Sequence, residues 1–162
     1  MNKSVSVELE ELFPIIKEKL SLGGSFKFSP KGVSMLPIIR PGIDSVTISP
    51  VNRKLKKYDV PLYRRDNGQF VLHRVISVKK NSYVMCGDNQ LVPEYNISDR
   101  HIIGLVTSIH RPDGIIYVND DSYVNYAKDR VKLQRKKGIF IRLKINIKRM
   151  LNKMHILKGA KG

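Results

Sequence analysis

The sequence lacks the features that mark several common classes of protein. It contains a single cysteine, Cys86, which excludes an internal disulfide and gives no sign of an oxidising compartment. The cysteine and histidine residues form no cluster with the spacing of a zinc site. We therefore expect neither a metal nor a cofactor.

Long apolar runs are also missing. A membrane-spanning helix needs about 20 apolar residues, and the longest stretch without a charged side chain has only ten, from His101 to His110. Glu8, Glu10 and Glu11 fall where a secretory signal would have its apolar core. We therefore expect a cytoplasmic chain that no helix anchors across a membrane.

The pattern of apolar residues predicts a mainly β protein. Residues 5–22 have the spacing of an amphipathic helix, which Gly23 and Gly24 would end. Short strands separated by turns follow it and predict a small, coiled, partly open β-barrel. Pro61 lacks a backbone N–H, so its strand should be bulged or lie at an edge. The expected strands are residues 26–28, 46–48, 59–64, 69–78, 83–86, 102–106 and 115–118.

A serine, a histidine and a carboxylate follow one another at intervals along this pattern. Ser34 lies in a turn between Gly32 and Pro37, where its hydroxyl and amide could be presented at a corner. His73 follows 39 residues later inside an apolar strand, and Asp88 comes 15 residues after it. Each residue alone is unremarkable, but the ordered set predicts a catalytic serine with a general base.

Four motifs in register resemble the S24/S26 serine peptidases, the superfamily of signal peptidases and LexA-like repressors. The motifs span about residues 26–109 and read G-V-S-M-L-P at 32–37, Y-D-V-P-L-Y-R at 58–64, V-L-H-R-V-I at 71–76 and G-D-N at 87–89. The resemblance implies the barrel of the signal-peptidase and LexA-like type. It also implies that His73 replaces the lysine base of the bacterial enzymes, as in the archaeal and endoplasmic-reticulum branch.

The acid that would orient His73 has two candidates. Asp88 is the obvious one, but in the superfamily this aspartate can instead pair with the arginine beside the base, here Arg74. A second acid follows about six residues later in the endoplasmic-reticulum enzymes, and Glu94 stands at that position. Asp99 is a weaker third candidate, which we interpret as a cap before the strand at Ile102.

Strand alternation divides the segment that contains the base. Val71, His73 and Val75 would share one face, with Arg74 on the other among apolar neighbours. A guanidinium in such surroundings needs an anion, which Asp88 or Asp59 could supply.

The expected mechanism is nucleophilic catalysis on a peptide bond. His73 would take the proton of Ser34 as its hydroxyl attacks a carbonyl. Backbone amides near Ser34 would stabilise the oxyanion, because Gly32 stands where some relatives have a serine hydroxyl. The resemblance implies a substrate that lies extended along an edge strand, with small side chains near the cut.

The C-terminal residues 128–162 differ in charge from the rest. They hold 13 lysines and arginines against one acid, Asp129, so they carry +12 of the net charge of +16. From Ile139 onward, apolar residues fall on one helical face, which is typical of a basic helix on an anionic membrane surface. Strict alternation from Ile139 to Ile147 also allows a strand, and a solvated extension remains an alternative. Nucleic acid is disfavoured, because the segment has almost no aromatic residues for stacking.

The sequence therefore predicts a peptidase-like domain at residues 1–127 and a basic extension at 128–162. We expect a serine endopeptidase that removes a leader or signal segment from a peptide or protein precursor, cytoplasmic or peripheral on the membrane's cytoplasmic face. One alternative is a LexA-like regulator that cleaves itself, disfavoured by His73 and by a short N-terminal segment. A non-catalytic peptide-binding relative is the other.

Overall fold

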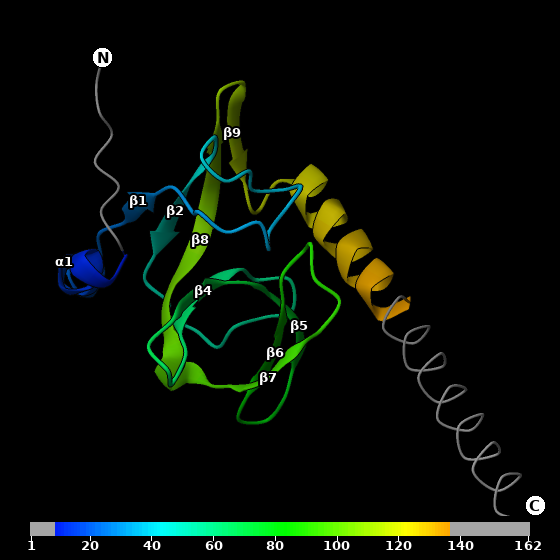
Figure 1. Cartoon of the computed structure of the whole chain (residues 1–162), viewed down its shortest axis with the longest axis horizontal. Coiled ribbons are helices and arrows are strands. Elements are labelled where there is room, and N and C mark those ends of the chain that lie inside the picture. The colour runs from blue at the N-terminus through cyan, green and yellow to red at the C-terminus, as the bar shows by residue number, and fades with distance from the viewer. Residues whose placement is uncertain (1–8, 137–162) are drawn as a thin grey trace, which may run out of the picture.

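The computed structural model of the protein describes residues 9–136, and this part of the chain is mainly β (Figure 1). Nine strands form two sheets within the described residues, with one helix near each end. The prediction of a mainly β chain with an N-terminal helix is confirmed. The elements are α1 (Leu9–Ser21), β1 (Phe26–Phe28), β2 (Ser45–Ser49), β3 (Pro61–Arg64), β4 (Phe70–Leu72), β5 (Arg74–Val78), β6 (Tyr83–Cys86), β7 (Glu94–Ile97), η1 (Asp99–His101), β8 (Ile102–Arg111), β9 (Gly114–Tyr117) and a helix over residues 121–136.

The larger sheet has six antiparallel strands in the order β1-β2-β8-β3-β4, with β9 also paired to β8. The strand that contains Pro61 lies inside this sheet rather than at an edge. Its register against β8 shifts between Leu62 and Tyr63, so the alternative prediction of a bulge is confirmed. Pro61 is the first residue of β3, where the missing N–H disturbs the ladder least.

The smaller sheet contains β5, β6 and β7. Its first strand was expected to be continuous with β4, but the chain leaves the ladder at His73 and enters the second sheet at Arg74. The two sheets do not close into a barrel within the described residues. The prediction of a single long strand over residues 69–78 is therefore wrong. His73 lies at the joint between the two sheets.

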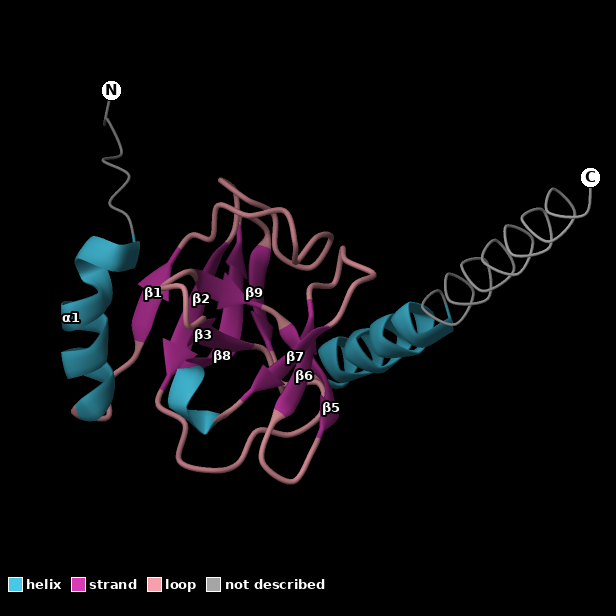
Figure 2. Ribbon diagram, turned by 60° about the horizontal axis from the view of Figure 1, so that its bottom comes forward, coloured by secondary structure: helices cyan, strands magenta, loops and turns pink. Residues whose placement is uncertain are grey.

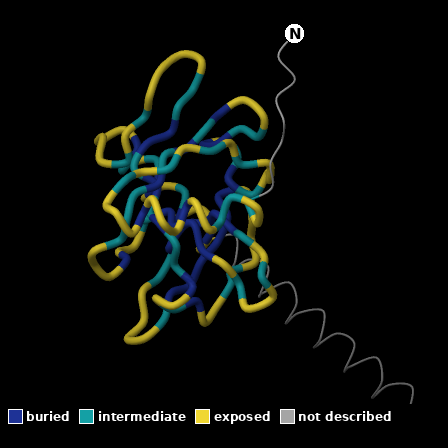
Figure 3. Tube along the Cα trace, turned by 90° about the vertical axis from the view of Figure 1, so that its left-hand side faces the viewer, coloured by how far each residue is buried: buried dark blue, intermediate teal, exposed yellow. Residues whose placement is uncertain are grey.

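Two apolar clusters form the interior, and the exposed residues concentrate in the connecting loops (Figure 3). The first cluster joins α1 to the larger sheet through Ile16 and Leu20. The second fills the space between the sheets and contains Val71 and Val75, while Leu72 belongs to the first. The expected division between two faces thus holds for Val71, Leu72 and Val75, but not further along β5, where the register shifts between Val75 and Ser77 and Val78 is exposed.

The helix α1 ends as its sequence predicts. Gly23 adopts a left-handed φ of 79°, which glycine accommodates without steric cost. The amides of Gly23 and Gly24 donate to the carbonyls of Leu20 and Lys19, each at 3.0 Å. These two bonds satisfy carbonyls that the helix itself leaves without donors. The first four residues of the expected helix, 5–8, lie outside the described residues.

The helix over residues 121–136 lies on the far side of the strands from α1 (Figures 1 and 2). It runs without a break through the expected boundary between residues 127 and 128. Tyr123 and Ala127 belong to the first apolar cluster, and Val131 and Gln134 are each only 7% exposed. The first nine residues of the expected extension therefore pack on the β domain. Residues 137–162, where the amphipathic pattern was read, lie outside the described residues.

No helix within residues 9–136 combines the length and the apolar composition that crossing a bilayer requires.

Candidate active site

Ser34 is half-buried in the turn that follows β1, and a second loop holds its backbone. The amide of Asn89 donates to the Ser34 carbonyl at 2.7 Å, and the Asn89 side-chain amide donates to the Val33 carbonyl at 3.3 Å. A Cβ on Gly87 would lie 2.7 Å from the Ser34 carbonyl oxygen. Only glycine therefore fits here, which explains the glycine of the G-D-N motif.

Ser34 and His73 line the same groove, which has a volume of about 930 Å³. The strands β1 and β4 form its two sides, and both are terminal strands of the larger sheet, each with one paired edge. Residues of α1 close one end. The large apolar side chains of the lining come from Leu9, Leu12, Phe26, Phe28, Met35, Leu62, Phe70, Val71 and Leu72.

His73 is buried, with 4% of its surface exposed, and its Nδ1 atom has two polar neighbours. The Tyr63 hydroxyl oxygen lies 3.1 Å from Nδ1, and Glu94 Oε2 lies 3.8 Å from it. Tyr63 also donates to Glu94 Oε2 at 2.8 Å. The acid thus reaches the imidazole mainly through the phenol.

A count of protons fixes the tautomer of this histidine. The phenol has one hydrogen and donates it to the Glu94 carboxylate, which is an acceptor only when ionised. The contact of the Tyr63 oxygen with Nδ1 must then use a hydrogen on the imidazole. Neutral His73 therefore carries its proton on Nδ1 and presents Nε2 as a lone pair, the form that a general base requires.

The surrounding charges keep Glu94 ionised. Partial burial alone would raise its pKa, but hydrogen bonds from Arg65 and Tyr63 outweigh burial and lower it. Arg65 Nε donates to Oε1 at 2.7 Å and Nη2 to Oε2 at 2.5 Å. Burial, reinforced by the bond to Glu94, raises the pKa of Tyr63 and keeps the phenol protonated.

Burial also decides the charge of the base. It lowers the pKa of His73 from 6.5 to about 4, although the Glu94 charge opposes the shift. The imidazole is therefore neutral at pH 7, with a free lone pair, and burial makes it a weaker base than an exposed histidine. Within the described residues, no hydrogen bond joins the Ser34 hydroxyl to His73. Such bonds often form only when substrate fills the site.

Asp88 lies elsewhere. Its carboxylate accepts from Arg74 Nε at 2.8 Å and Nη2 at 2.6 Å, and both side chains are fully buried. Asp88, rather than Asp59, thus supplies the anion that Arg74 needs, because Asp59 pairs with Arg53. Of the two predicted acids, the structure brings Glu94 to the histidine and Asp88 to the neighbouring arginine.

Asp99 makes no contact with His73 in the described structure. It is the first residue of η1 and accepts from the Tyr83 hydroxyl and from Lys54. These partners account for the carboxylate without any role at His73.

The sequence did not reveal two neighbours of the His73–Glu94 pair, Tyr63 and Arg65. Tyr63 stood inside a recognised motif, and Arg65 directly follows that motif, yet neither was assigned a role. The signal was weak, because β7, which carries Glu94, was not predicted as a strand. Its pairing with β6 brings Glu94 back towards the joint between the sheets, opposite Met85.

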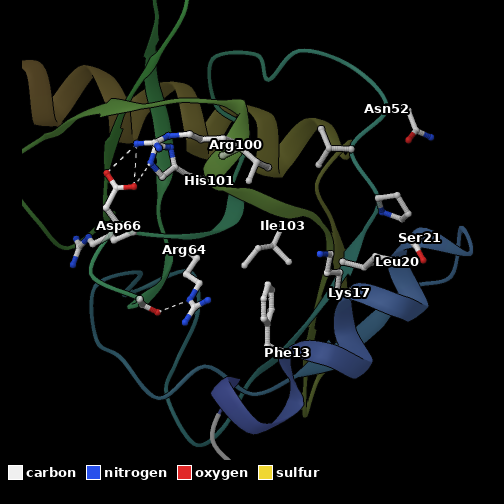
Figure 4. Close-up of a pocket in the computed structure, with 15 residues that line it drawn as sticks. Phe13, Lys17, Leu20, Ser21, Asn52, Arg64, Asp66, Arg100, His101 and Ile103 are labelled. Carbon is white, nitrogen blue, oxygen red and sulfur yellow. Dashed lines mark hydrogen bonds and ion pairs between the residues drawn. The ribbon is translucent and has the colours of Figure 1, made fainter.

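A second hollow of about 770 Å³ lies between α1, the β3–β4 hairpin and η1 (Figure 4). It also contains a serine and a histidine, but Ser21 donates to the Glu18 carbonyl and His101 contacts Ser98 and Asp66. Figure 4 shows Ser21 and His101 on opposite sides of the hollow. It therefore lacks a matched nucleophile and base.

Residues 9–136 contain no group of three or more His, Cys, Asp or Glu side chains that could hold a metal ion. Comparison of the chain with protein-family models, with curated proteins and with solved structures finds no match. The geometry of the groove and the motifs of the sequence are thus the basis for a functional proposal.

Proposed function

We propose that the protein is a serine endopeptidase that cleaves a leader or signal segment from a peptide or protein precursor. The observation that carries this proposal is that Ser34 and His73 line one groove while Tyr63 and Glu94 hold the far nitrogen of the imidazole. The motifs that resemble the S24/S26 peptidases support the same conclusion, as does a mainly β fold with terminal strands beside the groove.

The reaction begins with attack by the Ser34 hydroxyl on the scissile carbonyl. His73 Nε2 takes the hydroxyl proton and later gives it to the leaving amine. The imidazolium that forms in between is stabilised by Glu94, through the hydrogen bond of Tyr63. Water then hydrolyses the acyl-enzyme by the same proton transfers.

Backbone amides are the donors for the oxyanion. Ser34 and Met35 both line the groove, and within residues 9–136 neither amide N–H donates to another protein group. A donor aimed at the developing charge typically contributes about 2.7–4 kcal/mol to the transition state. Gly32 offers no side chain to add to them.

The substrate lies extended between β1 and β4. Among residues 9–136, each strand has one edge that no other strand of the sheet pairs, so its backbone can bond to a peptide as an added strand. The apolar lining favours apolar side chains in the groove. The resemblance to signal peptidases adds an expectation of small side chains next to the cut.

Active-site labelling tests this proposal. The protein is treated with a fluorophosphonate and its intact mass is measured for wild type, Ser34→Ala, His73→Ala and Ser29→Ala. Ser29 lines the same groove and serves as the matched control serine. We expect one adduct on wild type and on Ser29→Ala and none on the other two variants.

A second assay uses a mixed peptide library and mass spectrometry to detect cleavage. Products that wild type generates and Ser34→Ala does not would support the peptidase. A wild-type protein that forms no adduct and cleaves no peptide would overturn the proposal in favour of a peptide-binding module. Cleavage only within its own chain would instead indicate a self-cleaving regulator.

We also propose that the basic C-terminal segment attaches the enzyme to the cytoplasmic face of an anionic membrane. The 13 basic residues of positions 128–162 support this, and Lys128, Lys132 and Arg135 are exposed on the described helix. Vesicles that contain anionic lipid should retain the full chain and release a chain truncated after residue 137. Equal retention of both chains would remove the membrane proposal.

A further inference from the structure

Side chains of the helix over residues 121–136 donate hydrogen bonds to the loop that follows β6. Gln134 Nε2 donates to the Gly87 carbonyl at 2.7 Å and to the Gln90 carbonyl at 3.3 Å. Arg130 Nε donates to the Asp88 carbonyl at 2.7 Å. Two long side chains of one helix face thus satisfy three carbonyls of a four-residue loop.

The same loop holds the backbone of Ser34 from its other side. The Asn89 amide donates to the Ser34 carbonyl at 2.7 Å, and Gly87 approaches Ser34 so closely that no Cβ would fit. Loop residues 87–90 are therefore placed between the helix and the nucleophile, with hydrogen bonds on both sides.

The Gln134 side chain makes this contact in a buried position. Gln134 is 7% exposed, and its Oε1 atom is buried without a hydrogen-bond partner in the described structure. A buried acceptor without a partner is unfavourable, and the hydrogen bonds that Gln134 Nε2 donates to the Gly87 and Gln90 carbonyls offset that cost. Beneath it, the Asp88 carboxylate accepts from Tyr126 at 3.0 Å and from Arg74.

We propose that Arg130 and Gln134 are positioning residues that set the place of Ser34 through loop 87–90. The catalytic part of this inference rests on the proposed peptidase function, whereas the positional part does not. Ser34 acts on a carbonyl only within narrow limits of distance and direction. A loop released from the helix would therefore leave the serine present but misplaced.

Hydrogen exchange read by mass spectrometry tests the positional part on the full chain. Gln134→Glu keeps the size of the side chain but replaces its donor with an acceptor. Asn125→Asp makes the same amide-to-carboxylate change at an exposed position of the same helix and is the matched control. Arg130→Met removes the other donor, and Arg130→Lys retains one.

We expect exchange of the hydrogen-bonded amides of segments 33–36 and 87–90, which are those of Leu36, Asn89 and Gln90, to rise at least tenfold in Gln134→Glu and in Arg130→Met. It should stay unchanged in Asn125→Asp and should be intermediate in Arg130→Lys. Unchanged exchange at both segments in Gln134→Glu and Arg130→Met would overturn the inference, even if the helix itself exchanged faster. An equal rise in Asn125→Asp would also overturn it.

The rate of fluorophosphonate labelling tests the catalytic part. We expect the maximal rate of adduct formation to fall at least tenfold in Gln134→Glu and Arg130→Met, with unchanged half-saturation and partial rescue in Arg130→Lys. Equal maximal rates in wild type and both variants would overturn it. A wild type that forms no adduct and cleaves no peptide contradicts the peptidase instead, and the exchange result then decides the positional inference alone.

Discussion

Two adjacent residues at the joint between the sheets, His73 and Arg74, have opposite surroundings. Arg74 and Asp88 form a pair with no exposed surface, closed by Tyr123 and Tyr126. His73 is also buried, but it lines the groove, and the acid behind it is 22% exposed. One cluster is sealed on all sides and the other opens towards solvent.

The difference teaches that the conspicuous acid of a motif, here Asp88, need not be the acid that lies beside the candidate base His73. Asp88, the aspartate of the G-D-N motif, pairs with Arg74 inside the joint. Adjacent side chains of the chain point to opposite sides, so His73 faces the groove and Arg74 points inward. The acid that lies beside His73 is Glu94, which comes from the last strand of the smaller sheet. Four predictions test this division of roles.

The largest effect is expected from Asp88→Asn. Removing one partner of a buried ion pair leaves an uncompensated charge and typically costs about 3–5 kcal/mol. We expect the free energy of unfolding in urea to fall by about that amount. Asp99→Asn is the control, because Asp99 pairs with exposed Lys54, and such pairs contribute about 1 kcal/mol or less. Equal losses in the two variants would contradict a structural role for Asp88.

The next effect concerns acid stability. Burial lowers the pKa of His73 from 6.5 to about 4, so between these values the unfolded chain binds the extra proton. Stability should therefore rise with pH across this window, by about 3 kcal/mol from this group. His73→Gln should lose that part of the slope in urea unfolding between pH 4 and pH 7. A slope equal to that of wild type would show that the imidazole is not held neutral.

Tyr63→Phe should reduce labelling of Ser34 by about 100-fold, within the range found for proton-transfer groups. The variant keeps the ring but removes the oxygen that accepts from Nδ1, so the tautomer is no longer fixed. The measurement is the rate of fluorophosphonate adduct formation, with Tyr95→Phe as a control at an exposed position of β7. A rate within twofold of wild type would contradict the relay through the phenol.

Glu94→Gln should have the smallest effect, about tenfold on the same rate. The amide oxygen can still accept from Tyr63, so the tautomer survives while the negative charge is lost. The order of the two variants is informative. If Glu94 acted on His73 directly, Glu94→Gln would be the more damaging change and Tyr63→Phe the milder one.

The sequence predicted most of the strands because their signals are local. Turn residues such as Gly68, with φ of 90°, and the short apolar runs between turns indicate β3, β4 and β6. The break at His73 was missed, because the apolar run is continuous there and only tertiary pairing separates β4 from β5. The strand β7 was missed because Glu94, Tyr95 and Asn96 lack a clear apolar alternation.

The site was predictable in part for the same reason. Ser34 and His73 stand in compact motifs, and the structure places both at one groove. The choice between Asp88 and Glu94 depended on how β7 pairs, which no local pattern reveals. The contacts of Tyr63 and Arg65 with Glu94 depend on that same pairing, so the sequence alone could not predict them.

The joint at His73 makes the chemistry depend on the alignment of two separate bodies of structure. Tyr63 belongs to the larger sheet and Glu94 to the smaller one, and the imidazole lies where they meet. The contacts of Tyr63 with His73 and with Glu94 therefore join the two sheets, and they form only when both sheets are correctly placed. If the protein is the proposed peptidase, a small shift between the two sheets would abolish activity while leaving each sheet intact, so activity should be lost on heating before secondary structure is.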